Sequence, residues 1–150
     1  DQLGGMDWLP ELLTRAHVVM VCCPSTPATH RLLGRDEFAR MPPGGYLVNV
    51  SRGRIIDEEA LIAALRSGQL AGAGLDVFEE EPTPADNPLL KMDNVIVTPH
   101  SAGTSDRSNI AVQVQVGEET ARLLRGTFPM SIVNPEGRHR ITDRPAGVNA

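Results

Sequence analysis

The sequence predicts an α/β fold in which helices cover a parallel β-sheet. Short apolar runs rich in valine recur along the chain, and segments with helical apolar periodicity lie between them. The apolar runs are continuous rather than alternating, which is typical of strands buried on both faces of a parallel sheet. The chain has 150 residues, of which 41% are hydrophobic and 22% charged, as expected for one globular domain.

The first half of the chain is predicted to hold two helices and two strands. A short helix over Leu9–Arg15 precedes a strand over residues 17–23, whose run HVVMVCC ends at a proline. The turn-rich segment 24–30 is a loop, and a second short helix over Arg35–Arg40 is stopped by two prolines and two glycines. The apolar run YLVNV predicts a second strand over residues 46–50.

The second half is predicted to alternate in the same way. A helix starts after Asp57, a residue type that caps helix N termini, and ends at Gly68. Apolar runs predict a third strand over residues 71–78 and a fourth over 95–98, and a long helix follows over 104–125. Small or apolar residues recur along one face of this last helix, namely Ile110, Val114, Gly117, Ala121 and Leu124. Such alternation makes about half of a doubly wound sheet.

Side chains able to do chemistry follow three of the predicted strands. Ligands bind to sheets of this kind where the carboxyl ends of the strands meet. Arg52 follows the second strand, Glu81 the third and His100 the fourth. An arginine can bind a carboxylate or a polarised carbonyl, and a histidine can exchange a proton near neutral pH, in a tautomer that a bonded carboxylate would select. We therefore expect these three side chains to share one site.

Several blocks of the sequence resemble a known family. The segments VNVSRGRIIDEEAL (48–61), AGAGLDVFEEEP (71–82) and NVIVTPHSAGTS (94–105) are similar to conserved blocks of the D-isomer-specific 2-hydroxyacid dehydrogenases, such as the phosphoglycerate and glycerate or hydroxypyruvate dehydrogenases. CCPSTPATHRLL (22–33) resembles a loop of the same family. The resemblance implies an α/β fold that is the second half of a Rossmann-type doubly wound parallel sheet, followed by a long carboxyl-terminal helix.

The resemblance also implies an activity and a role for individual residues. It implies an oxidoreductase that transfers a hydride between NAD(P), with NAD favoured, and a D-2-hydroxy or 2-keto acid. Arg52 would bind substrate, His100 would be the acid–base group and Glu81 would orient it, while Asp76 would reach the nicotinamide carboxamide. The residues expected to line the cofactor are Cys22, Pro24, Thr29, Val50, Ser51, Arg52, Asp76, His100, Ala102 and Gly103.

One loop and one further residue limit how far the resemblance extends. The loop after the first strand commonly reads His-x-Pro-Leu-Thr in the family, whereas this chain has cysteines at the first two positions and serine at the fourth, so a contact made by that histidine is not carried over. Formate dehydrogenases of the superfamily carry glutamine in place of Glu81, which disfavours formate as the substrate.

Residues 1–134 are expected to form a partial NAD(P)-binding domain, and the polar residues 135–150 a disordered tail. The motif G-x-G-x-x-G does not occur, and no substrate domain is expected. We therefore expect a part of a longer enzyme, homodimeric when complete and inactive alone. Two alternatives stay open: an NAD(H)-sensing module, since corepressors of the superfamily retain the three site residues, and an inactive truncated product.

Composition argues against several other classes of protein. The net charge is −5, aromatic residues make up 3%, and no run of Lys or Arg exceeds two residues, which disfavours nucleic-acid binding. No apolar run is long enough to span a membrane. The adjacent Cys22 and Cys23 are not expected to form a disulfide, which favours the cytoplasm. The histidines outside the site, His17, His30 and His139, lack metal-ligand spacing, so no metal site is expected.

Overall fold

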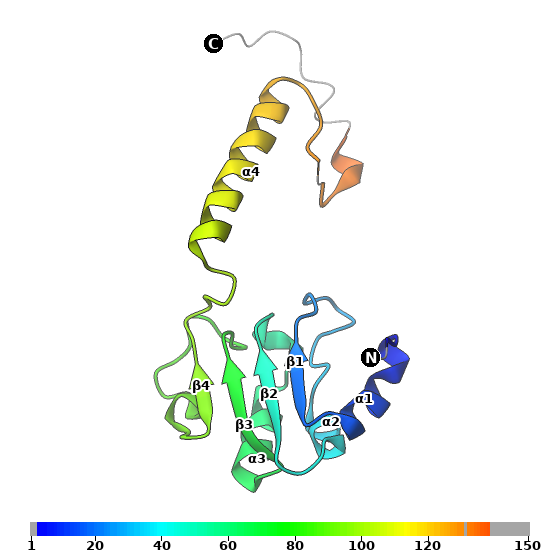
Figure 1. The fold of residues 1–150 in the computed structure, drawn as a ribbon, viewed down its shortest axis with the longest axis vertical. Coiled ribbons are helices and arrows are strands. Elements are labelled where there is room, and N and C mark those ends of the chain that lie inside the picture. Colours follow the sequence, from blue (N-terminus) through cyan, green and yellow to red (C-terminus); the bar gives the residue numbers. More distant parts are fainter. Residues whose placement is uncertain (1–2, 131, 139–150) are drawn as a thin grey trace. The chain divides into compact units, whose positions relative to one another are not determined.

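The computed structural model describes residues 3–130 and 132–138. The chain divides into two units, Asp1–Ala102 and Gly103–Ala150, each described by itself. The first unit is built on a four-stranded sheet, and the second holds a long helix (Figure 1). None of the described helices is both long enough and apolar enough to cross a membrane.

The sheet of the first unit is parallel throughout, as predicted. Its strands are β1 (Val18–Val21), β2 (Gly45–Asn49), β3 (Leu70–Leu75) and β4 (Val95–Val97), in the order β1-β2-β3-β4. Figure 1 shows the four arrows side by side and pointing the same way, so their carboxyl ends form one edge. The third strand was predicted to extend to residue 78, but it ends at Leu75 because the chain then turns out of the sheet into the site.

Three helices supply the core on one face of the sheet. They are α1 (Leu9–Arg15), α2 (Arg35–Arg40) and α3 (Glu58–Ser67), with the short 3-10 turns η1 (Met6–Trp8), η2 (Gly53–Ile55) and η3 (Pro88–Lys91) in the loops. Large side chains buried between helices and sheet include Leu13, Phe38, Leu47, Leu61, Leu65 and Leu75.

The ends of α3 confirm two predictions. The carboxylate of Asp57 accepts a hydrogen bond from the backbone N–H of Ala60 at 3.0 Å, which caps the first turn. Gly68 follows the last turn with φ +77°, a left-handed conformation that glycine adopts without strain. The sequence predicted both the start and the end of this helix from residue type alone.

The prediction that the first strand is buried on both faces is wrong, and Tyr46 of the second is also exposed. Along β1, Val19 and Val21 are buried, whereas Val18 and Met20 are each 59% exposed. Ile96 in β4 is 75% exposed. The physical reason is that α1, α2 and α3 pack together on the same face, so the described residues of this unit leave the opposite face uncovered.

The second unit consists of α4 (Asp106–Leu124) and the segment after it. Ser105 caps α4, accepting a hydrogen bond from the N–H of Ser108 at 3.1 Å. Among the described residues none of the helix is buried, and Ile110, Val114 and Leu124 of its predicted apolar face are exposed. A 3-10 turn, η4 (Pro135–Arg138), lies at the start of the expected tail, while residues 139–150, with His139, lie outside the described residues. The disordered tail therefore stays a prediction.

Candidate active site

Arg52 lies in a tight turn directly after β2. Asn49, the last residue of that strand, is 1% exposed and holds the turn from within. Its side-chain oxygen accepts a hydrogen bond from the N–H of Ser51 at 3.0 Å, and its side-chain amide donates to the carbonyl of Arg52 at 3.1 Å. The guanidinium of Arg52 donates to the carbonyl of Ser51 at 2.7 Å. The rest of its planar fork is left available for an anion.

Gly53 allows the Arg52 turn to lie against the loop that carries Glu81. A Cβ atom placed on Gly53 would lie 1.9 Å from the carbonyl carbon of Phe78 and 2.3 Å from the backbone nitrogen of Glu79. No side chain fits in that space. Glycine at this position therefore lets the two loops approach closely.

The loop with Glu81 is held by a residue of α3. One carboxylate oxygen of Glu58 accepts a hydrogen bond from the N–H of Glu79 at 3.0 Å, and the other accepts one from the side-chain amide of Asn87 at 2.6 Å. Glu58 thus joins both ends of the loop to the first turn of the helix. The Glu81–Pro82 peptide bond in this loop is cis.

The two carboxylate oxygens of Glu81 have different partners. One accepts a hydrogen bond from the N–H of Phe78 at 3.0 Å, and the other lies 2.8 Å from Nδ1 of His100. The Phe78 amide lowers the pKa of Glu81, and the His100 ring and the Arg52 guanidinium add to this against the opposing effect of burial. Because an ionised carboxylate can only accept, Nδ1 carries the hydrogen, and Nε2 of the neutral ring is free to take a proton.

His100 itself has an unusual backbone conformation. Its φ is +53°, a left-handed value that costs a residue other than glycine about 1 to 3 kcal/mol. The turn around it is bonded to the carboxylate of Asp76, which is 4% exposed and accepts hydrogen bonds from the hydroxyl of Thr98 and the amides of Ser101 and Ala102. Burial raises the pKa of Asp76, but these three donors and the charge of His100 together outweigh it, so the pKa lies below its ordinary value.

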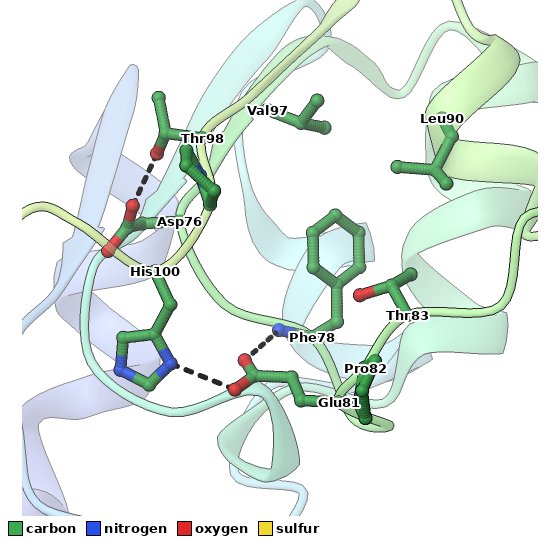
Figure 2. Close-up of a pocket in the computed structure, with 10 residues that line it drawn as sticks. Asp76, Phe78, Glu81, Pro82, Thr83, Leu90, Val97, Thr98 and His100 are labelled. Atoms are coloured by element: carbon green, nitrogen blue, oxygen red, sulfur yellow. Dashed lines mark hydrogen bonds and ion pairs between the residues drawn. The ribbon is translucent and has the colours of Figure 1, made fainter.

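The structure brings the three predicted residues together at the carboxyl edge of the sheet. Glu81 lines one cavity of about 710 Å³ with Asp76 and His100, and a neighbouring cavity of about 400 Å³ with Arg52. Figure 2 shows the imidazole directed at Glu81 through one nitrogen, while the second nitrogen points away from it. Glu81 therefore lies between the other two groups, beside the His100 imidazole in the first cavity and the Arg52 guanidinium in the second.

Known proteins are similar to this chain in sequence and in fold. Residues 2–102 match the model of the D-isomer specific 2-hydroxyacid dehydrogenase, NAD binding domain. The chain belongs to this family. A glyoxylate reductase of Korarchaeum cryptofilum is 40% identical over 134 residues, which are 88% of this chain and 40% of that protein. A D-3-phosphoglycerate dehydrogenase of Methanocaldococcus jannaschii is 43% identical over 129 residues, 86% of this chain and 24% of the other.

Solved structures of 2-hydroxyacid dehydrogenases have the same fold. One, from Xanthobacter autotrophicus Py2 in complex with NADPH and MES, has a TM-score of 0.76 and 42% identity, covering 88% of this chain and 54% of the other. The NAD-complexed form of one from Lactobacillus delbrueckii ssp. bulgaricus has a TM-score of 0.74 and 34% identity. The match covers 83% of this chain and 42% of the other. The chain thus spans about half or less of the length of these dehydrogenases.

Several residues expected to contact the cofactor use their side chains within the protein. The buried hydroxyl of Thr29 donates to the carbonyl of Pro24 at 2.8 Å and accepts from the N–H of Thr26 at 2.8 Å. The hydroxyl of Ser51 donates to the carbonyl of Cys23. Both hydroxyls thus shape the loops, and their direct contact with a dinucleotide stays a prediction.

Other expected cofactor residues lie at the same edge. Cys22, Pro24 and Ala102 are exposed there, and Val50 is half-buried. Gly103 falls in the second unit and is described with it. The thiols of Cys22 and Cys23 are both free in the structure. Cofactor contact by these residues is not tested by the geometry of the protein alone.

The residues that support the site could not be predicted from the sequence. Thr98 reads as the end of a strand, Glu58 as a favourable charge at a helix start, and Gly53 as one more loop glycine. Only Asn49 carries a local signal, because a buried amide at the end of an otherwise apolar strand must find hydrogen-bond partners. The other three act on loops far away in the sequence, which no local pattern reveals.

Proposed function

We propose that this chain carries the acid–base apparatus of an NAD(P)-dependent D-2-hydroxyacid dehydrogenase, an oxidoreductase that interconverts a D-2-hydroxy acid and a 2-keto acid. The observation that supports this most strongly is the 2.8 Å contact between Glu81 and Nδ1 of His100, with Arg52 beside the same carboxylate. Membership of the dehydrogenase family supports it independently. The alternative of an NAD(H)-sensing module is not favoured, because the relatives are named as reductases and dehydrogenases.

In this proposal His100 exchanges the substrate proton at Nε2. During reduction the protonated ring donates to the keto oxygen, and during oxidation the neutral ring accepts the hydroxyl proton. Glu81 holds the ring and balances the charge of its protonated form. Arg52 binds the substrate carboxylate with its free N–H groups and polarises the adjacent carbonyl. NAD(P), when bound, supplies or accepts the hydride at the substrate carbon.

The residues at the carboxyl edge fit the nicotinamide end of such a cofactor. Pro24, Arg52 and Ala102 are exposed in the loops after β1 and β2 and in the turn after β4, where a flat ring and its carboxamide could bind. The glycine-rich motif for a pyrophosphate does not occur in these 150 residues. We favour NAD over NADP because the matching model describes an NAD-binding domain, while solved relatives contain either.

Further parts of the proposal concern the whole enzyme. We propose that the complete protein is a homodimer, as the family resemblance implies, and that it is cytoplasmic, which the free thiols of Cys22 and Cys23 favour. Because the chain spans 40% or less of the length of its curated relatives, we also propose that the 150-residue chain alone is inactive. The same chain is expected to bind NADH more weakly than the complete protein. Titration calorimetry of the two proteins side by side tests this, and equal affinities would contradict it.

The test of the proposed function uses the full-length gene product. We expect it to reduce at least one small 2-keto acid, such as glyoxylate or hydroxypyruvate, with NADH or NADPH. The loss of absorbance of the reduced cofactor measures this reaction. His100→Ala should lower kcat/KM by more than about 100-fold, because general acid–base groups contribute that much. Full turnover in both His100→Ala and Arg52→Ala would refute the assignment.

A further inference from the structure

A buried carboxylate joins the turn after β4 to the end of β3. Asp76 accepts three hydrogen bonds there, from the hydroxyl of Thr98, the N–H of Ser101 at 2.8 Å and the N–H of Ala102 at 2.9 Å. The donors lie on both sides of His100 in the sequence. Asp76 is fixed in turn by its own N–H, which donates to the carbonyl of Asn49 in the neighbouring strand at 3.0 Å.

The turn that these hydrogen bonds close is tight. The N–H of His100 donates to the carbonyl of Thr98 at 3.1 Å, and the φ of His100 is +53°. Side chains other than glycine rarely adopt that conformation, so the turn needs support from outside. Of the three donors to Asp76, Thr98 provides the side-chain donor, whereas the other two are backbone amides that any residue would supply.

The direction of the imidazole depends on this turn. His100 reaches Glu81 through Nδ1 at 2.8 Å, although nearly half of its side chain, 47%, is exposed. Glu81 belongs to a separate loop, which is fixed by Glu58 and by the Phe78 amide. A small rotation of the turn would therefore part the ring from its acceptor, since that acceptor cannot follow.

We propose that Thr98 is a positioning residue for His100, whose hydroxyl acts through the carboxylate of Asp76 to hold the turn in the one conformation that places Nδ1 on Glu81. The catalytic consequence rests on the proposed function, because it takes His100 as the acid–base group. The structural consequence, which is the position of the His100 ring on Glu81, does not depend on the proposed function because it concerns only this chain.

Nuclear magnetic resonance of the 150-residue protein tests the structural consequence without activity. The nitrogen shifts of the neutral imidazole of wild-type His100 should show hydrogen on Nδ1. In Thr98→Val they should move toward the mixed tautomers of a free imidazole. Hydrogen exchange at the amides of Ser101 and Ala102 should quicken about tenfold or more, because the Asp76 carboxylate that accepts from both amides is no longer held by the Thr98 hydroxyl.

Two variants separate this effect from general loss of structure. Thr98→Ser keeps the hydroxyl and should restore the wild-type ring signal and exchange. Thr83→Val makes the same chemical change in a residue of the same cavity whose hydroxyl has no hydrogen bond with the described residues, and it should leave both unchanged. An unchanged tautomer in Thr98→Val overturns the proposal, and so does exchange that rises equally at Leu47 in the sheet.

Kinetics of the full-length gene product test the catalytic consequence. Thr98→Val should lower kcat about tenfold while changing the KM for the 2-keto acid little, and Thr98→Ser should retain most of the turnover. A shifted ring signal in a protein without any dehydrogenase activity would refute the proposed function and keep the positioning role. Wild-type kcat in Thr98→Val would refute the positioning role and keep the proposed function.

Discussion

The carboxylate of Glu81 contacts Nδ1 of His100 at 2.8 Å and so determines which ring nitrogen faces a substrate. Both groups are partly exposed, with 38% of the Glu81 side chain and 47% of the His100 side chain open to solvent. The contact therefore depends on how firmly the two loops are held rather than on burial of the pair. Glu58 of α3 and the Phe78 amide hold the loop of Glu81, and Asp76 at the end of β3 holds the turn of His100.

Glu81→Gln should lower kcat/KM of the complete enzyme by about 10- to 100-fold with little change in melting temperature. The amide can donate to Nδ1 as well as accept from it, so it no longer selects one tautomer. Steady-state kinetics across pH measures the effect. Glu80→Gln is the control, since this exposed neighbour has no hydrogen bond or ion pair with the described residues, and equal losses in both variants would contradict the prediction.

The pH dependence of the free energy of unfolding should reveal the contribution of Asp76 to stability. Its pKa is lowered in the folded protein, so its contribution to the free energy of unfolding is fully present above the unfolded pKa of about 3.9 and is lost as pH falls through the lower folded value. Asp76→Asn removes this dependence. Urea unfolding in acidic buffers should show a shallower decline for the variant, whereas parallel curves for the two proteins would mean that Asp76 gains nothing from its three donors.

Gly53→Ala should destabilise the protein by about 3 kcal/mol or more, because the new Cβ would overlap the backbone of Phe78. It should also separate Arg52 from Glu81 and abolish activity of the complete enzyme. Gly74→Ala is the matched control, since a Cβ there would meet Val48 at an ordinary 3.8 Å. Thermal unfolding distinguishes the two variants. Similar melting temperatures would show that the loops can move apart with little loss of stability.

Glu58→Ala should remove both hydrogen bonds by which α3 holds the loop of Glu81 and lower kcat about tenfold, since small misplacements near a reacting group are costly. Glu59→Ala removes an adjacent exposed carboxylate that has no hydrogen bond with the described residues, and it should keep wild-type kcat. The comparison measures the role of the loop attachment separately from helix charge. Normal turnover in Glu58→Ala would show that the Phe78 amide suffices.

Much of the architecture could be predicted because it depends on short-range rules. Continuous apolar runs located all four strands, and Asp57 and Gly68 marked the ends of α3. The convergence of Arg52, Glu81 and His100 followed from the parallel order alone, since residues after successive parallel strands meet at one edge.

The remainder depends on contacts between loops that are distant in sequence. The residues next to His100 in the sequence do not predict its positive φ, because the carboxylate that stabilises the turn belongs to Asp76, at the end of another strand. The uncovered face of the sheet was also missed. Continuous apolar runs cannot distinguish a strand covered on both faces from one whose second face is open, as Met20 and Ile96 show.

That open face has a calorimetric consequence. The heat capacity change on unfolding measures how much apolar surface becomes newly hydrated, normally about 12–15 cal/mol/K per residue. Val18, Met20, Tyr46 and Ile96 are already more than half hydrated in the native first unit, so they add little to that change. The stability curve of this unit against temperature should be broad and flat for its length, and its resistance to cold correspondingly high.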